Sequence, residues 1–112
     1  MSGFGQEYKQ ESMKSIISNL NKIFESRLRL GAMSILVVND EVDFNTLKEL
    51  LQVTDGNLAS HLKSLEKHEF IRVKKEFVNR KTKTTYQTTI KGKKAFKQHI
   101  DNLQNLITNI DN

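Results

Sequence analysis

The sequence FNTLKELLQVTDGNLASHLKSL, residues 44–65, contains two short helical patterns separated by a three-residue break. Apolar residues recur at three- and four-residue steps in both halves, so each half has one apolar stripe and a polar opposite face. The stripes consist of Phe44, Leu47, Leu50 and Leu51 in the first half and of Leu58, Leu62 and Leu65 in the second. After the break, Thr54 or Asp55 can accept backbone N–H bonds and start the second helix. The pattern predicts a helix-turn-helix whose two stripes face one core.

The second helix presents polar side chains opposite its leucines. These side chains donate or accept hydrogen bonds, and they are short or flexible enough to reach base edges in a major groove. For His61, contact with DNA and simple exposure are equally open, and Gly56 either lets the backbone approach a phosphate or is a tolerated small residue. The candidate DNA-binding residues of this helix are Thr54, Asp55, Gly56, Asn57, Ser60, His61, Lys63 and Ser64.

Length and composition predict one folded domain over residues 1–112. A hydrophobic content of 37% is typical of a folded chain, and the absence of proline leaves no proline-rich linker to divide it. No apolar run approaches the roughly 20 residues of a membrane helix, and the N-terminus lacks the apolar core of a secretion signal. We therefore expect a cytoplasmic protein that does not enter the membrane. Cysteine is absent, which excludes disulfides and thiolate metal sites.

The net charge of +5 is unevenly distributed. Between Arg72 and Lys97 there are ten basic residues and one acidic residue, Glu76, whereas the rest of the chain has eight basic and twelve acidic residues. The positive charge therefore follows the helix-turn-helix. A lysine-rich surface exposed to solvent is the simplest explanation of an isolated charge run, but its position here favours contact with the phosphates of a polyanion.

The segment after the second helix predicts a β-hairpin. Residues 71–78 begin with alternating apolar and polar side chains, and residues 84–88 are rich in β-forming threonine and tyrosine. Residues 79–83, NRKTK, would form a polar, cationic tip between the strands. Upstream, Ser26 can cap a largely buried helix, and residues 42–43 can form a very short strand before Phe44.

The order of these elements, and several of their residues, resemble the compact MarR/ArsR-like winged-helix transcriptional regulators. The resemblance covers roughly residues 24–100 and is carried by RLRLGAMSIL (27–36), VDFNTLKELLQVTDGNLASHLKSLEKHEFI (42–71) and NRKTKTTYQTTIKGKKAF (79–96). It implies a mainly α fold with a small β-hairpin, a winged helix-turn-helix with long terminal helices.

The resemblance also implies roles for these elements. The helix at 54–67 would enter the major groove, the hairpin at 71–89 would be the wing, and Tyr86 would pack inward. Arg80 would approach the minor groove or its phosphates, and Lys81 and Lys83 beside it are further candidate DNA-binding residues. The chain departs from the family pattern after the capping Thr89, where Ile90 and Lys91 replace the frequent acidic residues, and at Thr88, which replaces a leucine.

Two terminal helices, at 6–25 and 90–110, carry apolar seams. The spacing of 4, 3, 4 and 3 residues in the second seam is typical of a coiled coil. The helices can pack on each other within one chain, but we prefer a homodimer interface, which would place two reading helices on one face of a duplex. The candidate dimerisation residues are Met13, Ile16, Leu20, Phe96, Ile100, Leu103, Ile107 and Ile110.

No pattern predicts an enzyme, a metal site or a cofactor. The three histidines, His61, His68 and His99, are scattered, and no cysteine or carboxylate cluster accompanies them. The expected function is a sequence-specific regulator that binds double-stranded DNA as a dimer and represses by occluding a promoter. The alternative is a winged-helix module that binds another protein. The operator, and whether a small-molecule effector exists, are left open.

Overall fold

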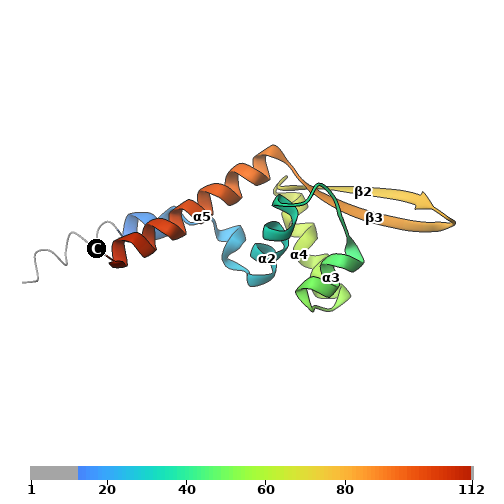
Figure 1. The fold of residues 1–112 in the computed structure, drawn as a ribbon, viewed down its shortest axis with the longest axis horizontal. Coiled ribbons are helices and arrows are strands. Elements are labelled where there is room, and N and C mark those ends of the chain that lie inside the picture. The colour runs from blue at the N-terminus through green and yellow to red at the C-terminus, as the bar shows by residue number, and fades with distance from the viewer. Residues whose placement is uncertain (1–12, 112) are drawn as a thin grey trace, which may run out of the picture.

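The computed structural model describes residues 13–111 of the chain and the side chains of residues 13–109. Residues 13–18 are helical. They are followed by a 3-10 helix η1 (Lys22–Glu25), α2 (Arg27–Val37), β1 (Val42–Asp43), α3 (Phe44–Leu51), α4 (Asp55–Lys67), β2 (Ile71–Val78), β3 (Lys81–Thr88) and α5 (Ile90–Asp111). Helices α2, α3 and α4 form a central group, from which α5 and the hairpin of β2 and β3 project in opposite directions (Figure 1).

The core forms where the apolar stripes of the central helices meet. Leu58, Leu62 and Leu65 of α4 are each at most 2% exposed, and they share a cluster with Leu47 of α3 and Leu36 of α2. The two predicted helices and the break at residues 52–54 are confirmed. The predicted stripe of α3 is wrong at Leu50, which is 61% exposed. Gln52 adopts a left-handed conformation (φ 53°, ψ 57°) that ends α3 and turns the chain toward α4.

Three antiparallel strands lie in the order β1-β3-β2. The predicted short strand at residues 42–43 is confirmed and pairs with β3, with Val42 opposite Tyr86. Tyr86 packs inward as expected, is 8% exposed, and lies with its ring centroid 6.5 Å from that of Phe44. These helices and strands form a winged helix, the predicted fold class.

The tip of the hairpin is shorter than predicted. Residues 79–83 were expected to form the loop, but Lys81–Lys83 belong to β3, and Val78 pairs with Lys81. Only Asn79 and Arg80 connect the strands, and both have positive φ (52° and 66°), as in a type I′ turn. The amino-acid sequence does not indicate this turn, because arginine replaces the glycine that usually occupies its second position.

The predicted continuous helix at 6–25 is wrong within the described residues. The helical segment ends at residue 18, and Asn21 is extended, with its side chain accepting a hydrogen bond from the Ile23 N–H (2.9 Å) at the start of η1. Ser26 is also extended and caps α2, as predicted, by accepting from the Arg29 N–H (3.3 Å). Asparagine and serine form such local bonds readily, which favours breaks over helix interiors. Residues 6–12 lie outside the described part.

A contact with α5 holds this break in place. The Asn21 N–H donates to His99 Nδ1 (3.1 Å), and His99 is 5% exposed. Burial lowers the pKa of His99, despite the opposing influence of Glu25, and so favours the neutral ring that can accept this bond. Phe24 packs beside it, with its ring centroid 5.3 Å from the imidazole and 5.7 Å from Phe96. The segment before α2 is therefore docked on α5 of the same chain.

A second junction joins the end of α4, the base of the hairpin and the start of α5. The Thr89 N–H donates to the Phe70 carbonyl (3.0 Å), and Thr89 Oγ1 accepts from the Gly92 N–H (2.9 Å), which confirms the predicted cap. A Cβ on Gly92 would lie 2.0 Å from the Phe70 carbonyl oxygen. This close approach requires glycine.

Within residues 13–111, no helix combines the length and hydrophobicity needed to cross a lipid bilayer.

Gly92→Ala is expected to lower stability by about 1–3 kcal/mol, because the added methyl group forces the two backbone segments apart. Gly56→Ala is the matched control. Gly56 is also helical, and a Cβ added there would meet nothing within 4 Å, so alanine should raise stability by about 0.5–1 kcal/mol. Thermal unfolding monitored by circular dichroism measures both. Equal effects of the two substitutions would contradict the assigned junction.

Candidate nucleic-acid interface

The start of α4 is fixed by two contacts within the helix-turn-helix. Thr54 Oγ1 accepts a hydrogen bond from the Asn57 N–H (3.3 Å), so the predicted cap is formed by Thr54. Asp55 pairs with Lys48 of α3 (2.8 Å) and places a negative charge in the first turn of α4, where the helix dipole favours it. Both candidate residues therefore have roles within the chain. A contact of either with DNA remains a prediction.

The leucine stripe of α4 faces the core, so its polar side chains face solvent. Gly56, Asn57, Ser60 and Lys63 are exposed, and Ser64 is half-buried. The sequence interpretation omitted Lys67, which is exposed in the last turn of α4. The omission was avoidable, because Lys67 lies four residues after Lys63 and therefore on the same side of the helix. We name this surface, Gly56, Asn57, Ser60, Lys63, Ser64 and Lys67, the α4 face.

His61 does not belong to the α4 face, contrary to the prediction. It is half-buried beside α2, where the Arg29 guanidinium donates to its Nδ1 (3.1 Å). His61 lies three residues after Leu58 and four before Leu65, so it borders the apolar stripe. Arg29 is itself held by the Ile23 carbonyl (2.6 Å). Because a guanidinium only donates, Nδ1 must accept, and the proton of the neutral ring is on Nε2.

The hairpin carries several exposed cations. Lys74 pairs with Glu41 (3.6 Å) and with Glu76 (3.4 Å), and these carboxylates, Glu41 first, raise the pKa of Lys74. Glu76 is the only acidic residue of the hairpin. Within residues 13–109, no ion pair engages the remaining cations of the hairpin, Arg72, Lys75, Arg80, Lys81 and Lys83.

The two faces of the hairpin have different surroundings. On one face, Val73 and Lys75 of β2 line a groove of about 170 Å³ with Ala59 and Lys63 of α4. We call this side, which also carries Tyr86, the inner face of the hairpin. The α4 face and the inner face therefore border one groove, and a ligand lying on α4 would meet the hairpin at its inner face.

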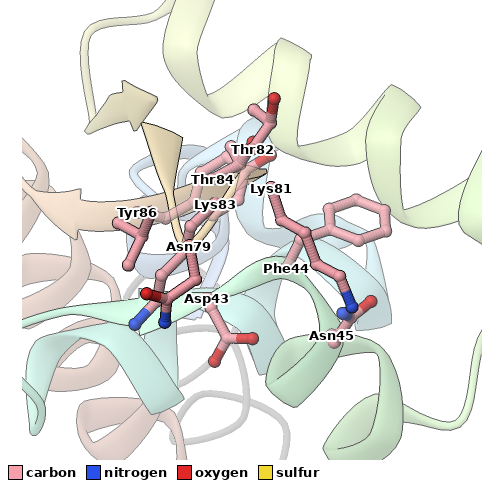
Figure 2. A pocket seen from close by; sticks show the side chains of 10 residues that line it. Asp43, Phe44, Asn45, Asn79, Lys81, Thr82, Lys83, Thr84 and Tyr86 are labelled. Carbon is pink, nitrogen blue, oxygen red and sulfur yellow. The ribbon is translucent and has the colours of Figure 1, made fainter. Parts of the chain in front are cut away.

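A wider groove of about 830 Å³ separates the start of α3 from β3 and the tip of the hairpin. Figure 2 shows Phe44 and Asn45 of α3 together with Asn79, Lys81 and Lys83 of the hairpin. Asp43 also lines it, and the hydroxyl of Thr46, which donates to its carboxylate, lowers the pKa of Asp43. Two ammonium groups and two amides make this groove suited to an anionic ligand such as a phosphate.

Comparison with known proteins agrees with this geometry. Residues 28–107 match the model of the winged helix DNA-binding domain family. The chain belongs to this family. The family match and the similar solved structures confirm the winged-helix resemblance found in the sequence.

Known proteins and solved structures are similar to this winged-helix protein over most of its length. It is 41% identical over 90 residues to an uncharacterized protein of Methanocaldococcus jannaschii. The aligned residues cover 80% of this chain and 98% of that protein. A transcriptional regulator homologue from Pyrococcus horikoshii OT3 has a similar structure, with a TM-score of 0.80, 27% identity and coverage of 91% of this chain and 99% of that one. A MarR-family regulator from Silicibacter pomeroyi shares the fold, with a TM-score of 0.60, 18% identity and coverage of 97% and 75%.

At the strained turn of the wing, a single substitution is expected to weaken DNA binding without lowering the stability of the fold. Arg80 adopts the left-handed conformation, which costs an L-residue roughly 1–2 kcal/mol, so Arg80→Gly should leave the thermal midpoint unchanged or raise it. The same substitution should weaken binding to all duplexes and lower the salt slope of log K by about one unit. Asn79→Gly is the matched control, because it relieves the same turn without removing a charge. A normal salt slope for Arg80→Gly would exclude a phosphate contact by Arg80.

Proposed function

We propose that the protein is a sequence-specific regulator that binds double-stranded DNA as a homodimer, each chain forming one winged-helix domain. The α4 face would occupy the major groove, and the cations of the wing would contact the adjacent backbone and minor groove. The observation that carries the proposal is the shared groove between α4 and the wing, which places a hydrogen-bonding surface beside unneutralised positive charge. Repression would follow from occlusion of a promoter by the bound dimer.

Binding-site selection with the purified protein tests this function. A random duplex pool should yield one palindromic motif with half-sites about 10–10.5 base pairs apart, or a multiple of that spacing. Binding to random duplex should be weaker and should fall steeply between two salt concentrations. If the protein binds no duplex at low salt, the alternative of a protein-binding module is favoured. Salt-sensitive binding without an enriched motif would refute sequence specificity.

The dimer interface is proposed from apolar side chains that are exposed in the described part of the chain. Ile100 and Ile107 of α5 are 38% and 59% exposed, and Ile17 is 54% exposed. The predicted seam is therefore divided, because Phe96 and Leu103 are half-buried while the two isoleucines remain open. Met13, Ile16 and Leu20 are half-buried as well, and the side chain of Ile110 lies outside the described part. A second copy would cover Ile17, Ile100 and Ile107.

Charge at the two exposed isoleucines should split the dimer without unfolding the chain. Ile100→Glu/Ile107→Glu is expected to sediment as a monomer at micromolar concentration, to keep weak nonspecific binding, and to lose tight binding to the palindrome. Ile90→Glu is the control, since Ile90 is 74% exposed at the opposite end of α5. A monomeric parent, or a double mutant that still dimerises, would contradict the interface.

Asn57→Ala should change sequence preference, because an amide on the α4 face can bond to an adenine edge in the major groove. The expected loss of discrimination is about 1–3 kcal/mol at one position in each half-site. Lys67→Ala is the comparison, since a lysine contact with phosphate should lower the affinity for all sequences alike. Selection of the same motif at the same stringency by Asn57→Ala and by the parent would show that another surface reads the bases.

A further inference from the structure

One aromatic side chain of the wing is not explained by the fold. Phe77, the next-to-last residue of β2, is 76% exposed, although a phenylalanine ring is among the largest apolar groups that folding can bury. Its partner across the hairpin is Thr82, whose small side chain leaves the ring uncovered. Scattered exposed apolar residues are ordinary, so the position of the ring, rather than its exposure, decides what it can do.

Phe77 lies on the inner face of the hairpin. Side chains alternate along a strand, so Phe77 shares its face with Val73 and Lys75, which line the groove against α4. Phe77 lies four positions after Val73, a distance of about 13 Å at 3.3 Å per residue. The minor groove next to an occupied major groove lies about half a helical turn away, or roughly 17 Å along the duplex. The ring is therefore at the range where a duplex seated on α4 presents its minor groove.

The charges around Phe77 point to the same occupant. Lys75, Arg80 and Lys81 surround this part of the wing and have no ion-pair partner within residues 13–109, whereas the carboxylate of Glu76 is paired with Lys74. A second copy that met this surface with its own wing would bring the same positive charge, whereas a polyanion would neutralise it.

We propose that Phe77 is an apolar wedge for the minor groove of duplex DNA. Its ring would lie against the sugars or enter a flexible pyrimidine–purine step and bend the duplex, so that the wing contributes shape-dependent specificity beyond its phosphate contacts. The inference rests on the proposed function, because it requires a duplex on the α4 face. It adds deformation of the DNA to that function.

Ring closure of a short duplex tests the wedge without an identified operator. The probe is a random-sequence duplex of about 120 base pairs with cohesive ends, which is shorter than the DNA persistence length and circularises slowly with ligase. The parent protein at saturation should raise the circularisation rate at least about tenfold over DNA alone. Phe77→Ala should remain within about twofold of DNA alone, and Phe77→Leu should be intermediate, because leucine retains part of the wedge.

Val78→Ala is the matched control. Val78 is the next residue on the same strand, is 43% exposed and faces the opposite side of the hairpin. It lines the groove between α3 and the hairpin tip, but alanine leaves the ammonium and amide groups of that groove in place, so the variant should bend DNA as the parent does. Phe77→Ala should keep the parent's thermal midpoint and the salt slope of its binding to the same probe. These two measurements separate a wedge from a structural or electrostatic role.

Each outcome of the experiment has one meaning. If Phe77→Ala circularises the probe as well as the parent, or if the parent binds the probe without bending it, the wedge is refuted and the proposed function stands. If the parent binds no duplex at low salt, the proposed function itself fails, and the wedge fails with it. If Phe77→Ala lowers the sedimenting mass and leaves bending unchanged, the ring belongs to a contact between protein copies.

Discussion

The burial of one leucine stripe on α4 is the constraint on which the rest of the structure depends. Leu58, Leu62 and Leu65 are excluded from water against α2 and α3, and each contributes roughly 1.5–3 kcal/mol of burial free energy. A helix that buries one stripe must expose the opposite one. The polar side chains of α4 are therefore turned outward by the core itself, and the same packing that stabilises the fold creates the candidate binding surface.

A junction of backbone hydrogen bonds sets the direction of the wing and of α5. Glu69 has a positive φ of 62°, and the Phe70 N–H donates to the Leu65 carbonyl (3.0 Å), which ends α4. The Phe70 carbonyl then accepts from Thr89, so both ends of the hairpin are held at one place. Beyond that base, the hairpin is stabilised by its own pairing, by the two residues of β1, by the packing of Tyr86 against Phe44 and by the ion pair of Lys74 with Glu41. The wing is thus anchored at its base and projects away from the core.

Several features that lower stability lie together at the tip of the wing. Asn79 and Arg80 occupy the left-handed region, several cations have no ion-pair partner within residues 13–109, and Phe77 is 76% exposed. Each departs from what the isolated fold would favour, because glycine, balanced charge and a smaller polar side chain would all cost less. Such a combination is expected where a surface is completed by a ligand. A polyanion would neutralise the charge and cover the ring.

Much of the architecture could be predicted from the sequence, because it depends on local periodicity and capping. Neighbouring residues were enough to predict three features. These are the spacing of leucines in α3 and α4, the basic run after α4, and the caps at Ser26, Thr54 and Thr89. The length of the hairpin tip was mistaken, since its register depends on pairing across the strands and on left-handed residues that composition does not reveal.

Other features were decided only by the tertiary structure. The break at Asn21 is held by His99, 78 residues away, and the inward position of His61 depends on Arg29 of another helix. Glycine is required at position 92 because the Phe70 carbonyl, which lies after the end of α4, approaches it closely. The sequence by itself determined the helices from α2 to α5 and the leucine stripe that α4 buries, because those depend on intervals of a few residues. It did not reveal the break at Asn21 or the 61% exposure of Leu50. Packing between distant segments decided which polar groups remain free for a ligand, because no local pattern specifies which residues will become their neighbours.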